Sequence, residues 1–140
     1  MDATGDLIEL ALREDIGTGD ITTDHLVAAD ALGKGSIVAK QELIVAGLAV
    51  AERVFRQLAP RIAFDAQVED GRQVGPGSVV ARIDGSLRAL LKGERTALNF
   101  LQRLSGIATQ TRTYVEAVAG SGVTLVDTRK TTPGWRTLEK

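Results

Sequence analysis

The spacing of hydrophobic residues predicts two helices and several strands in the first part of the chain. Apolar residues at helical intervals predict a short amphipathic helix over residues 6–13 and a second helix from about Leu48 to Leu58, which Pro60 ends. Alternating apolar residues between turn formers predict five short strands. These strands are expected at residues 35–40, 43–45, 62–69, 73–74 and 79–84.

Asp70 and Gly71 are the clearest turn signal in this region. An Asp-Gly pair between two alternating stretches is typical of a tight β-hairpin, so we expect residues 62–69 to pair with the strand at 73–74. The first 90 residues are therefore predicted to form an α+β unit with a small, mainly antiparallel sheet.

From Leu91 the apolar residues change to helical spacing. Leu98, Leu101 and Leu104 begin a stripe that continues at intervals of three and four residues to Val118. The stripe predicts one helix about 40 Å long at ~1.5 Å per residue, with Arg95 in its first turn. Gly106 inside a helix costs about 1 kcal/mol relative to alanine, so we expect a close packing partner there.

Residues 123–126 form a short, nearly all-apolar run after that helix. Such a run is typical of a strand buried on both faces of a parallel sheet. A polar loop follows at residues 127–134, and Trp135 begins what we expect to be another helix. Helix, buried strand, loop and helix in this order begin an α/β barrel or an open parallel sheet.

Composition narrows the classes of protein. The 140 residues include one His and no Cys, which excludes disulfide frameworks, zinc fingers, thiol nucleophiles and iron–sulfur clusters. The longest apolar run, residues 43–51, is far shorter than the ~20 residues that span a bilayer. The acidic start is unlike the basic lead of a signal peptide. We therefore expect a soluble, cytoplasmic protein with no membrane partner.

Charge is distributed unevenly along the chain. Acidic side chains outnumber basic ones over residues 1–90, and the balance reverses over residues 91–140. The second segment therefore favours an anionic small molecule, with scattered solvated cations as the alternative. No nucleic-acid partner is expected, because basic residues alternate with Glu and aromatic residues make up only 4% of the chain.

An acidic loop at residues 15–24 raises the question of a metal site. The spacing of Asp15, Asp20 and Asp24 fits no calcium-binding loop, and helix caps or Asx turns explain these residues more simply. His25 has no Cys or second His as a partner, so we interpret it as a surface or core residue. The sequence assigns no metal ligand and no catalytic group.

The loop after the predicted strand is the strongest candidate binding site. Ligands of parallel α/β proteins bind beyond the carboxyl ends of the strands, where Thr128, Arg129 and Lys130 lie. Arg presents a planar fork that matches a carboxylate, and Lys presents a compact charge that suits a phosphate. These residues predict a site for an anion, with a solvated basic loop as the alternative.

Two long motifs resemble the quinolinate phosphoribosyltransferase family, also called nicotinate-nucleotide pyrophosphorylase (carboxylating). They are GERTALNFLQRLSGIAT at residues 93–109 and DTRKTTPG at residues 127–134, and the loop at residues 13–22 fits as well. The resemblance implies an N-terminal α/β sandwich domain over residues 1–92. Residues 93–140 would then hold the long linking helix and the start of an α/β barrel that is incomplete in this chain.

The resemblance also implies a reaction. Family members join quinolinate to phosphoribosyl pyrophosphate with Mg²⁺, release carbon dioxide and pyrophosphate, and yield nicotinate mononucleotide for NAD synthesis. They assemble as a homodimer or a larger homo-oligomer.

By the motif match, Arg95 resembles the arginine that grips quinolinate in the neighbouring subunit's site. Arg129 resembles its partner on the substrate carboxylates, and Lys130 resembles a contact to phosphoribosyl pyrophosphate. Thr128 belongs to the same loop. The alternative for Arg95 is an exposed ion pair within the chain, with Glu94 nearby.

Length is the departure from this family. Its members run about twice as far, with the expected Mg²⁺ ligands beyond residue 140, and a full barrel needs on the order of 200 residues. We therefore expect residues 1–140 alone to be inactive. Three alternatives stay open: a molybdenum-operon pyrophosphorylase-like relative of the same fold, a non-catalytic dimerising domain, and a biotinyl- or lipoyl-like scaffold over residues 68–85.

Overall fold

The structure, a computed structural model, describes residues 2–140 and contains two small antiparallel sheets. In the larger sheet, β5 (Val79–Ser86) lies between β1 (Leu32–Val38) and β3 (Ala63–Ala66). In the smaller one, β2 (Leu43–Ile44) pairs with β4 (Gln73–Val74). Up to residue 90, the predicted number and approximate places of the strands are confirmed.

The predicted hairpin at Asp70 is wrong, because β3 and β4 belong to different sheets. The Asp70 carboxylate instead accepts hydrogen bonds from the backbone N–H groups of Gly47 (2.9 Å) and Leu48 (3.1 Å). It therefore satisfies free donors at the start of α3 (Leu48–Leu58). The Asp-Gly turn serves a helix far away in the sequence rather than a hairpin.

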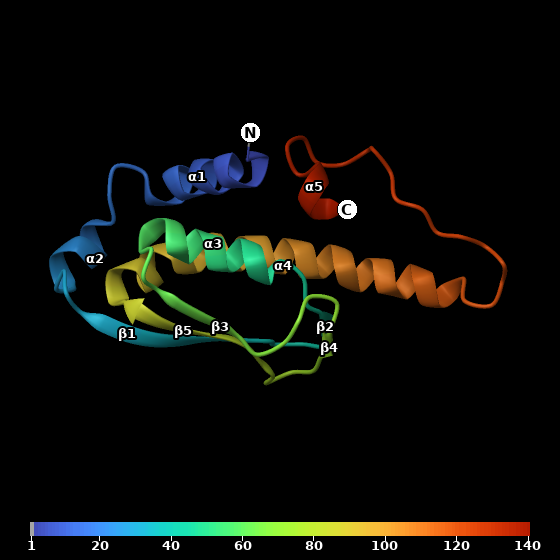
Figure 1. Cartoon of the computed structure of the whole chain (residues 1–140), viewed down its shortest axis with the longest axis horizontal. Helices are drawn as coiled ribbons and strands as arrows, with labels where there is room; N and C mark the ends of the chain where they lie inside the picture. Colours follow the sequence, from blue (N-terminus) through green and yellow to red (C-terminus); the bar gives the residue numbers. More distant parts are fainter. Residues whose placement is uncertain (1) are drawn as a thin grey trace.

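Helices cover one face of the larger sheet (Figure 1). Helix α3 and the N-terminal part of α4 (Leu87–Ala117) lie next to that sheet, and α1 (Ala3–Ile16) packs against both helices. The bounds of α3 agree with the prediction, whereas α1 is longer than expected. The core between these layers is apolar, and its most deeply buried large side chains are Ile8, Val45, Val54 and Phe100.

The segment expected to be a loop at residues 15–24 contains a short helix, α2 (Ile21–Leu26). The Asp20 carboxylate accepts a hydrogen bond from the Thr23 backbone N–H at 3.0 Å, which confirms the helix-cap interpretation of this residue. His25 lies exposed in the last turn, with Nδ1 2.8 Å from the Ile21 carbonyl oxygen. It is a surface residue, as expected.

Helix α4 begins earlier than expected and spans 31 residues. The Ser86 hydroxyl accepts a hydrogen bond from the Ala89 backbone N–H (3.4 Å) and caps the helix, so Arg95 lies in the third turn rather than the first. The predicted division between residues 92 and 93 falls inside this helix, and it stays a prediction.

The predicted close packing at Gly106 is wrong, because no atom of residues 2–140, apart from its chain neighbours and the nearby backbone of its own helix, lies within 4 Å of an added Cβ. Gly93 has that role instead: an added Cβ would lie 2.9 Å from Phe55 Cδ1. The apolar stripe is buried at Leu101 and Leu104 but exposed at Val115. The last turns of α4 therefore extend beyond the core.

Residues 123–126 do not form the predicted buried strand in this chain. Val123, Leu125 and Val126 are 62%, 46% and 77% exposed. A strand needs a hydrogen-bonding neighbour, and no other segment of residues 2–140 pairs with this one. The expected helix after Trp135 forms as α5 (Arg136–Glu139). Among the described residues, no helix is both long and apolar enough to cross a membrane.

Candidate functional site

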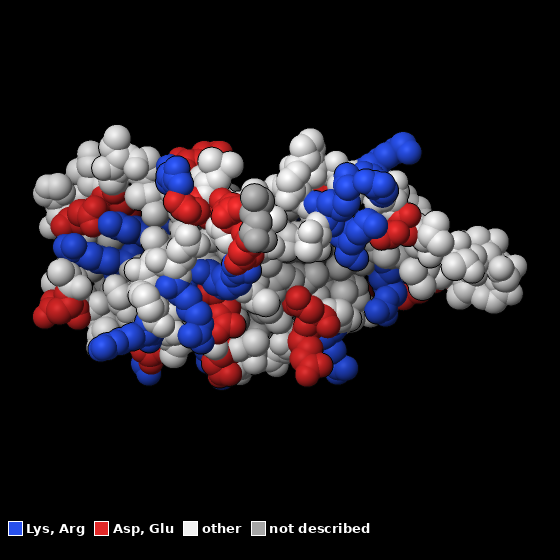
Figure 2. All heavy atoms as spheres, turned by 45° about the horizontal axis from the view of Figure 1, so that its top comes forward, with Lys and Arg blue, Asp and Glu red and all other residues white. Residues whose placement is uncertain are grey.

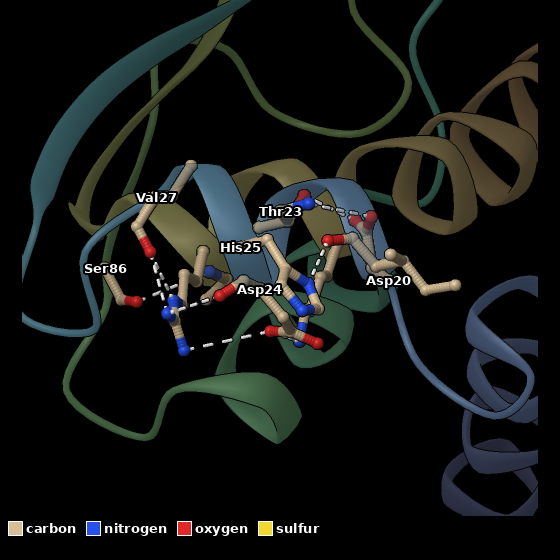
Figure 3. Close-up of polar contacts among 10 residues, drawn as sticks. Asp20, Thr23, Asp24, His25, Val27 and Ser86 are labelled. Carbon is tan, nitrogen blue, oxygen red and sulfur yellow. Dashed lines mark hydrogen bonds and ion pairs between the residues drawn. The ribbon is translucent and has the colours of Figure 1, made fainter.

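Three cations on one face of α4 are directed toward α1 and α2. Arg88, Lys92 and Arg95 follow one another at intervals of four and three residues, so they share a helix face. Lys92 Nζ lies 2.6 Å from Asp24 Oδ1. Arg88 Nη2 donates to the carbonyl oxygens of Val27 (2.7 Å) and Asp24 (3.0 Å). Figure 3 shows Asp24 and Val27 turned toward this face of α4.

These polar contacts attach α2 to α4, because the apolar side chains of α2 contribute little. Ile21 and Leu26 are 75% and 79% exposed. The hydrogen bonds that Asp20 accepts from the hydroxyl and the backbone N–H of Thr23 hold the pKa of Asp20 below its ordinary value. Asp20 therefore stays ionised as a cap.

Arg95, the first predicted binding residue, is held more loosely than its neighbours. Its Nε lies 3.0 Å from Asp15 Oδ1, and its side chain is 76% exposed. The expected alternative partner was Glu94, but the observed partner is Asp15 in the last turn of α1. Both residues line a shallow pocket of about 210 Å³ that also includes Gly19 and Lys92.

The predicted anion loop is exposed in this chain. Thr128 Oγ1 accepts a hydrogen bond from the Lys130 backbone N–H at 3.1 Å, so the threonine shapes the loop. The Arg129 carbonyl oxygen accepts a hydrogen bond from Arg136 Nη2 at 3.2 Å. Within residues 2–140, the charged ends of Arg129 and Lys130 form no ion pair with a protein group. Both are therefore available to a ligand.

Side-chain contacts attach the C-terminal segment to the middle of α4. The rings of Phe100 and Trp135 stack with centroids 4.9 Å apart. Arg103 Nη2 lies 2.7 Å from Glu139 Oε1 and 2.8 Å from Thr132 Oγ1. Arg103 and Thr132 together lower the pKa of Glu139 to about 2. Figure 2 shows a group of Lys and Arg side chains in the upper right part of the view, inward of the tip of the molecule.

The structure does not bring the two predicted parts of the site together. Arg95 lies with α1 and α2, whereas residues 128–130 belong to the segment that returns over α4 from its far end (Figure 1). None of the three best-formed pockets in the described residues is lined by both. Within one chain, they are separate groups of cations.

Two models of one protein family match this chain. Residues 20–105 match the family model "Quinolinate phosphoribosyl transferase, N-terminal domain". Residues 107–140 match "Quinolinate phosphoribosyl transferase, C-terminal domain". The chain belongs to the quinolinate phosphoribosyltransferase family. This confirms the family expected from the sequence motifs and replaces the biotinyl- or lipoyl-like alternative.

Curated relatives and solved structures of the quinolinate phosphoribosyltransferase family agree. A probable nicotinate-nucleotide pyrophosphorylase (carboxylating) of Synechocystis is 48% identical over 92% of this chain and 43% of the relative. The Bacillus subtilis counterpart is 44% identical over 91% of this chain and 44% of its own length. The nicotinate-nucleotide pyrophosphorylase structure from Francisella tularensis gives a TM-score of 0.91 at 36% identity, over 99% of this chain and 49% of that one.

These matches confirm the predicted fold class, an N-terminal α+β domain followed by the start of an α/β barrel. The NadC structure from Streptococcus pyogenes gives a TM-score of 0.89 at 42% identity, covering 95% of this chain and 48% of that one. The chain spans about half the length of the relatives it matches.

A Mg²⁺ ion, which the quinolinate phosphoribosyltransferase resemblance implies, does not fit the residues present. No group of three or more His, Asp or Glu side chains among residues 2–140 is placed to hold a metal ion. Asp15, Asp20 and Asp24 are each engaged with a protein partner. The described residues therefore form no Mg²⁺ site.

Proposed function

We propose that this chain is part of an enzyme that transfers the phosphoribosyl group of phosphoribosyl pyrophosphate to quinolinate. The transfer releases pyrophosphate, and decarboxylation then gives nicotinate mononucleotide and carbon dioxide. The main support for this proposal is the match to relatives named nicotinate-nucleotide pyrophosphorylase (carboxylating), at 48% and 44% identity across more than nine tenths of the chain. Mg²⁺ belongs to this proposal only as the ion that accompanies phosphoribosyl pyrophosphate.

The exposed cations support this proposal by their chemistry. Arg129 would bind a quinolinate carboxylate through its planar fork, and Lys130 would bind a phosphate as a point charge. Thr128 would hold the loop that presents them, as its hydrogen bond to the Lys130 N–H suits it to do. Quinolinate carries two carboxylates and phosphoribosyl pyrophosphate several phosphates, so such a site needs several fixed cations.

Arg95 would act in the site of a neighbouring chain. Its position apart from residues 128–130 supports this arrangement, as does its exposed side chain. A two-fold homodimer, alone or within a larger homo-oligomer, would bring each Arg95 to the partner's loop. We place this enzyme in the cytoplasm.

The test joins residues 1–140 to the part of the Bacillus subtilis relative that lies beyond the matching region. This hybrid protein should release carbon dioxide from quinolinate when phosphoribosyl pyrophosphate and Mg²⁺ are supplied. A hybrid with Arg129→Ala serves as the control and should release far less. A folded hybrid without turnover would contradict the proposed reaction.

The 140-residue chain alone is assayed in parallel, and we expect no turnover from it. The exposed residues 123–126 motivate this expectation, because the site follows a segment that has no strand partner here. Carbon dioxide release by the chain alone would contradict this expectation.

A further inference from the structure

The three cations on α4 differ in how completely the protein engages them. Arg88 and Lys92 have side chains that are 30% and 21% exposed, and each is held by oxygen atoms of α2 or the residue that follows it. Arg95 is 76% exposed, and its Nε lies 3.0 Å from Asp15 Oδ1. Arg88 and Lys92 therefore attach α2 to α4, whereas most of the Arg95 side chain is exposed to solvent.

The contact at Arg95 leaves most of its hydrogen-bonding capacity free. A guanidinium carries five N–H donors in one plane, and the contact with Asp15 is made at Nε. Among residues 2–140, neither terminal nitrogen of Arg95 donates a hydrogen bond to a protein group. These two nitrogens form the edge that can bind a carboxylate through two parallel hydrogen bonds.

Asp15, the partner of the Arg95 guanidinium, is held in place by the packing of its helix. It lies in the last turn of α1, which is anchored in the core by Ile8 and Leu12 at 0% and 6% exposure. The Asp15 side chain itself is only 23% exposed. Arg95 lies on α4, which packs against the same core through Thr96 and Ala97. Both ends of the ion pair are therefore carried by rigidly packed helices.

We propose that Asp15 is a positioning residue for Arg95: its carboxylate holds Nε so that the outer edge of the guanidinium faces a carboxylate ligand. An unrestrained arginine samples many rotamers, and ordering it on binding costs conformational entropy. The ion pair with Asp15 restrains the Arg95 side chain before a ligand binds, so less of this entropy is lost on binding. This inference rests on the proposed function, which makes quinolinate the carboxylate ligand.

The first experiment uses the hybrid protein and separates substrate affinities. Asp15→Asn should raise the KM for quinolinate about tenfold while the KM for phosphoribosyl pyrophosphate changes less than about twofold. Asp15→Glu keeps the carboxylate and should lose no more than about threefold. Glu9→Gln is the matched control, because it removes one charge and one ion pair, with Arg13, from the same helix.

A double-mutant cycle tests whether Asp15 acts through Arg95. Adding Asp15→Asn to Arg95→Lys should change the quinolinate KM by less than about twofold, because the group to be positioned has already been replaced. Additive effects would overturn the inference, as would an unchanged quinolinate KM in Asp15→Asn. Equal losses for both substrates would also overturn it, since they would indicate a general structural role.

The second experiment needs no turnover and uses the 140-residue chain. In ¹⁵N-labelled protein, the Nε–H resonance of Arg95 should shift on Asp15→Asn and stay unchanged on Glu9→Gln. A resonance unmoved by Asp15→Asn would overturn the contact and the inference with it. An inactive parent hybrid would instead overturn the proposed function, so the two failures are distinguishable.

Discussion

At Gly93, helices α3 and α4 approach so closely that a side chain has no room. An added Cβ would lie 2.9 Å from Phe55 Cδ1 and 3.0 Å from Leu58 Cδ1. Phe55 is itself only 2% exposed, so its ring cannot move aside cheaply. An added Cβ at Gly106 on the same helix would meet no described atom within 4 Å, apart from its chain neighbours and the nearby backbone of α4.

These two glycines form a matched pair for mutation. Gly93→Ala should lower the free energy of unfolding by about 1–3 kcal/mol, because overpacking outweighs the gain in helix propensity. Gly106→Ala should raise it by up to about 1 kcal/mol, since only the propensity changes. Urea unfolding followed by circular dichroism measures both. The packing argument fails if the two variants change stability in the same direction.

A second residue-scale prediction concerns Arg129 in the hybrid protein. Arg129→Lys should weaken quinolinate binding about tenfold, because an ammonium group cannot reproduce the two parallel hydrogen bonds of a guanidinium. Binding calorimetry with quinolinate measures the change. Arg13→Lys, on an exposed face of α1, is the control and should have no effect. Unchanged affinity in Arg129→Lys would refute this role.

Among single residues, the sequence identifies binding residues that lie together in one loop, but it does not identify residues whose partners are distant in the sequence. Arg129 and Lys130 could be chosen because they share a loop after an apolar run. Asp15 and Arg103 could not, because their partners Arg95 and Glu139 are distant in sequence and only folding brings each pair together.

Among the elements, the C-terminal segment is held to α4 by few contacts, and one of them titrates. Arg103 and Thr132 lower the pKa of Glu139 from 4.5 to about 2. A carboxyl group whose pKa is lower in the folded state stabilises that state fully above its unfolded pKa. This stabilisation is lost as the pH falls from about 4.5 to about 2.

Trp135 reports this loss, because it is the chain's single tryptophan and stacks on Phe100. Its fluorescence should change between about pH 4.5 and pH 2 as the segment leaves α4. Glu139→Gln should remove this acid step, whereas Glu116→Gln, an exposed change near the end of α4, should keep it. An acid step retained in Glu139→Gln would assign the titration to another group.

The elements that could be predicted are those whose ends are set locally. Helix α3 agrees with its prediction because Gly47 and Pro60 flank it closely in the sequence. The hairpin prediction failed because Asp70 is used by a distant helix, and the strand at residues 123–126 failed because a strand needs a neighbour. Helix α2 was missed because its six residues lack an apolar stripe long enough to recognise.

For the whole molecule, the separation of Arg95 from residues 128–130 leads to a prediction about assembly. If Arg95 serves a neighbouring chain, hybrids with Arg95→Ala and with Arg129→Ala are each inactive for different reasons. After mixing and subunit exchange, each heterodimer should regain one working site. Carbon dioxide release measures the recovery. No recovery despite confirmed exchange would place Arg95 in the site of its own chain.

The number of residues in α4 determines the orientation of the groups at its two ends as well as the distance between them. An α-helix turns about 100° per residue, so one residue inserted between Lys92 and Phe100 would rotate everything after it around the axis. Phe100 would leave the core, and Trp135 would lose its stacking partner. The number of residues in α4 therefore sets how the two groups of cations are oriented relative to each other about the helix axis. Changes of length should be tolerated only after the helix ends, at the turn between Gly120 and Gly122.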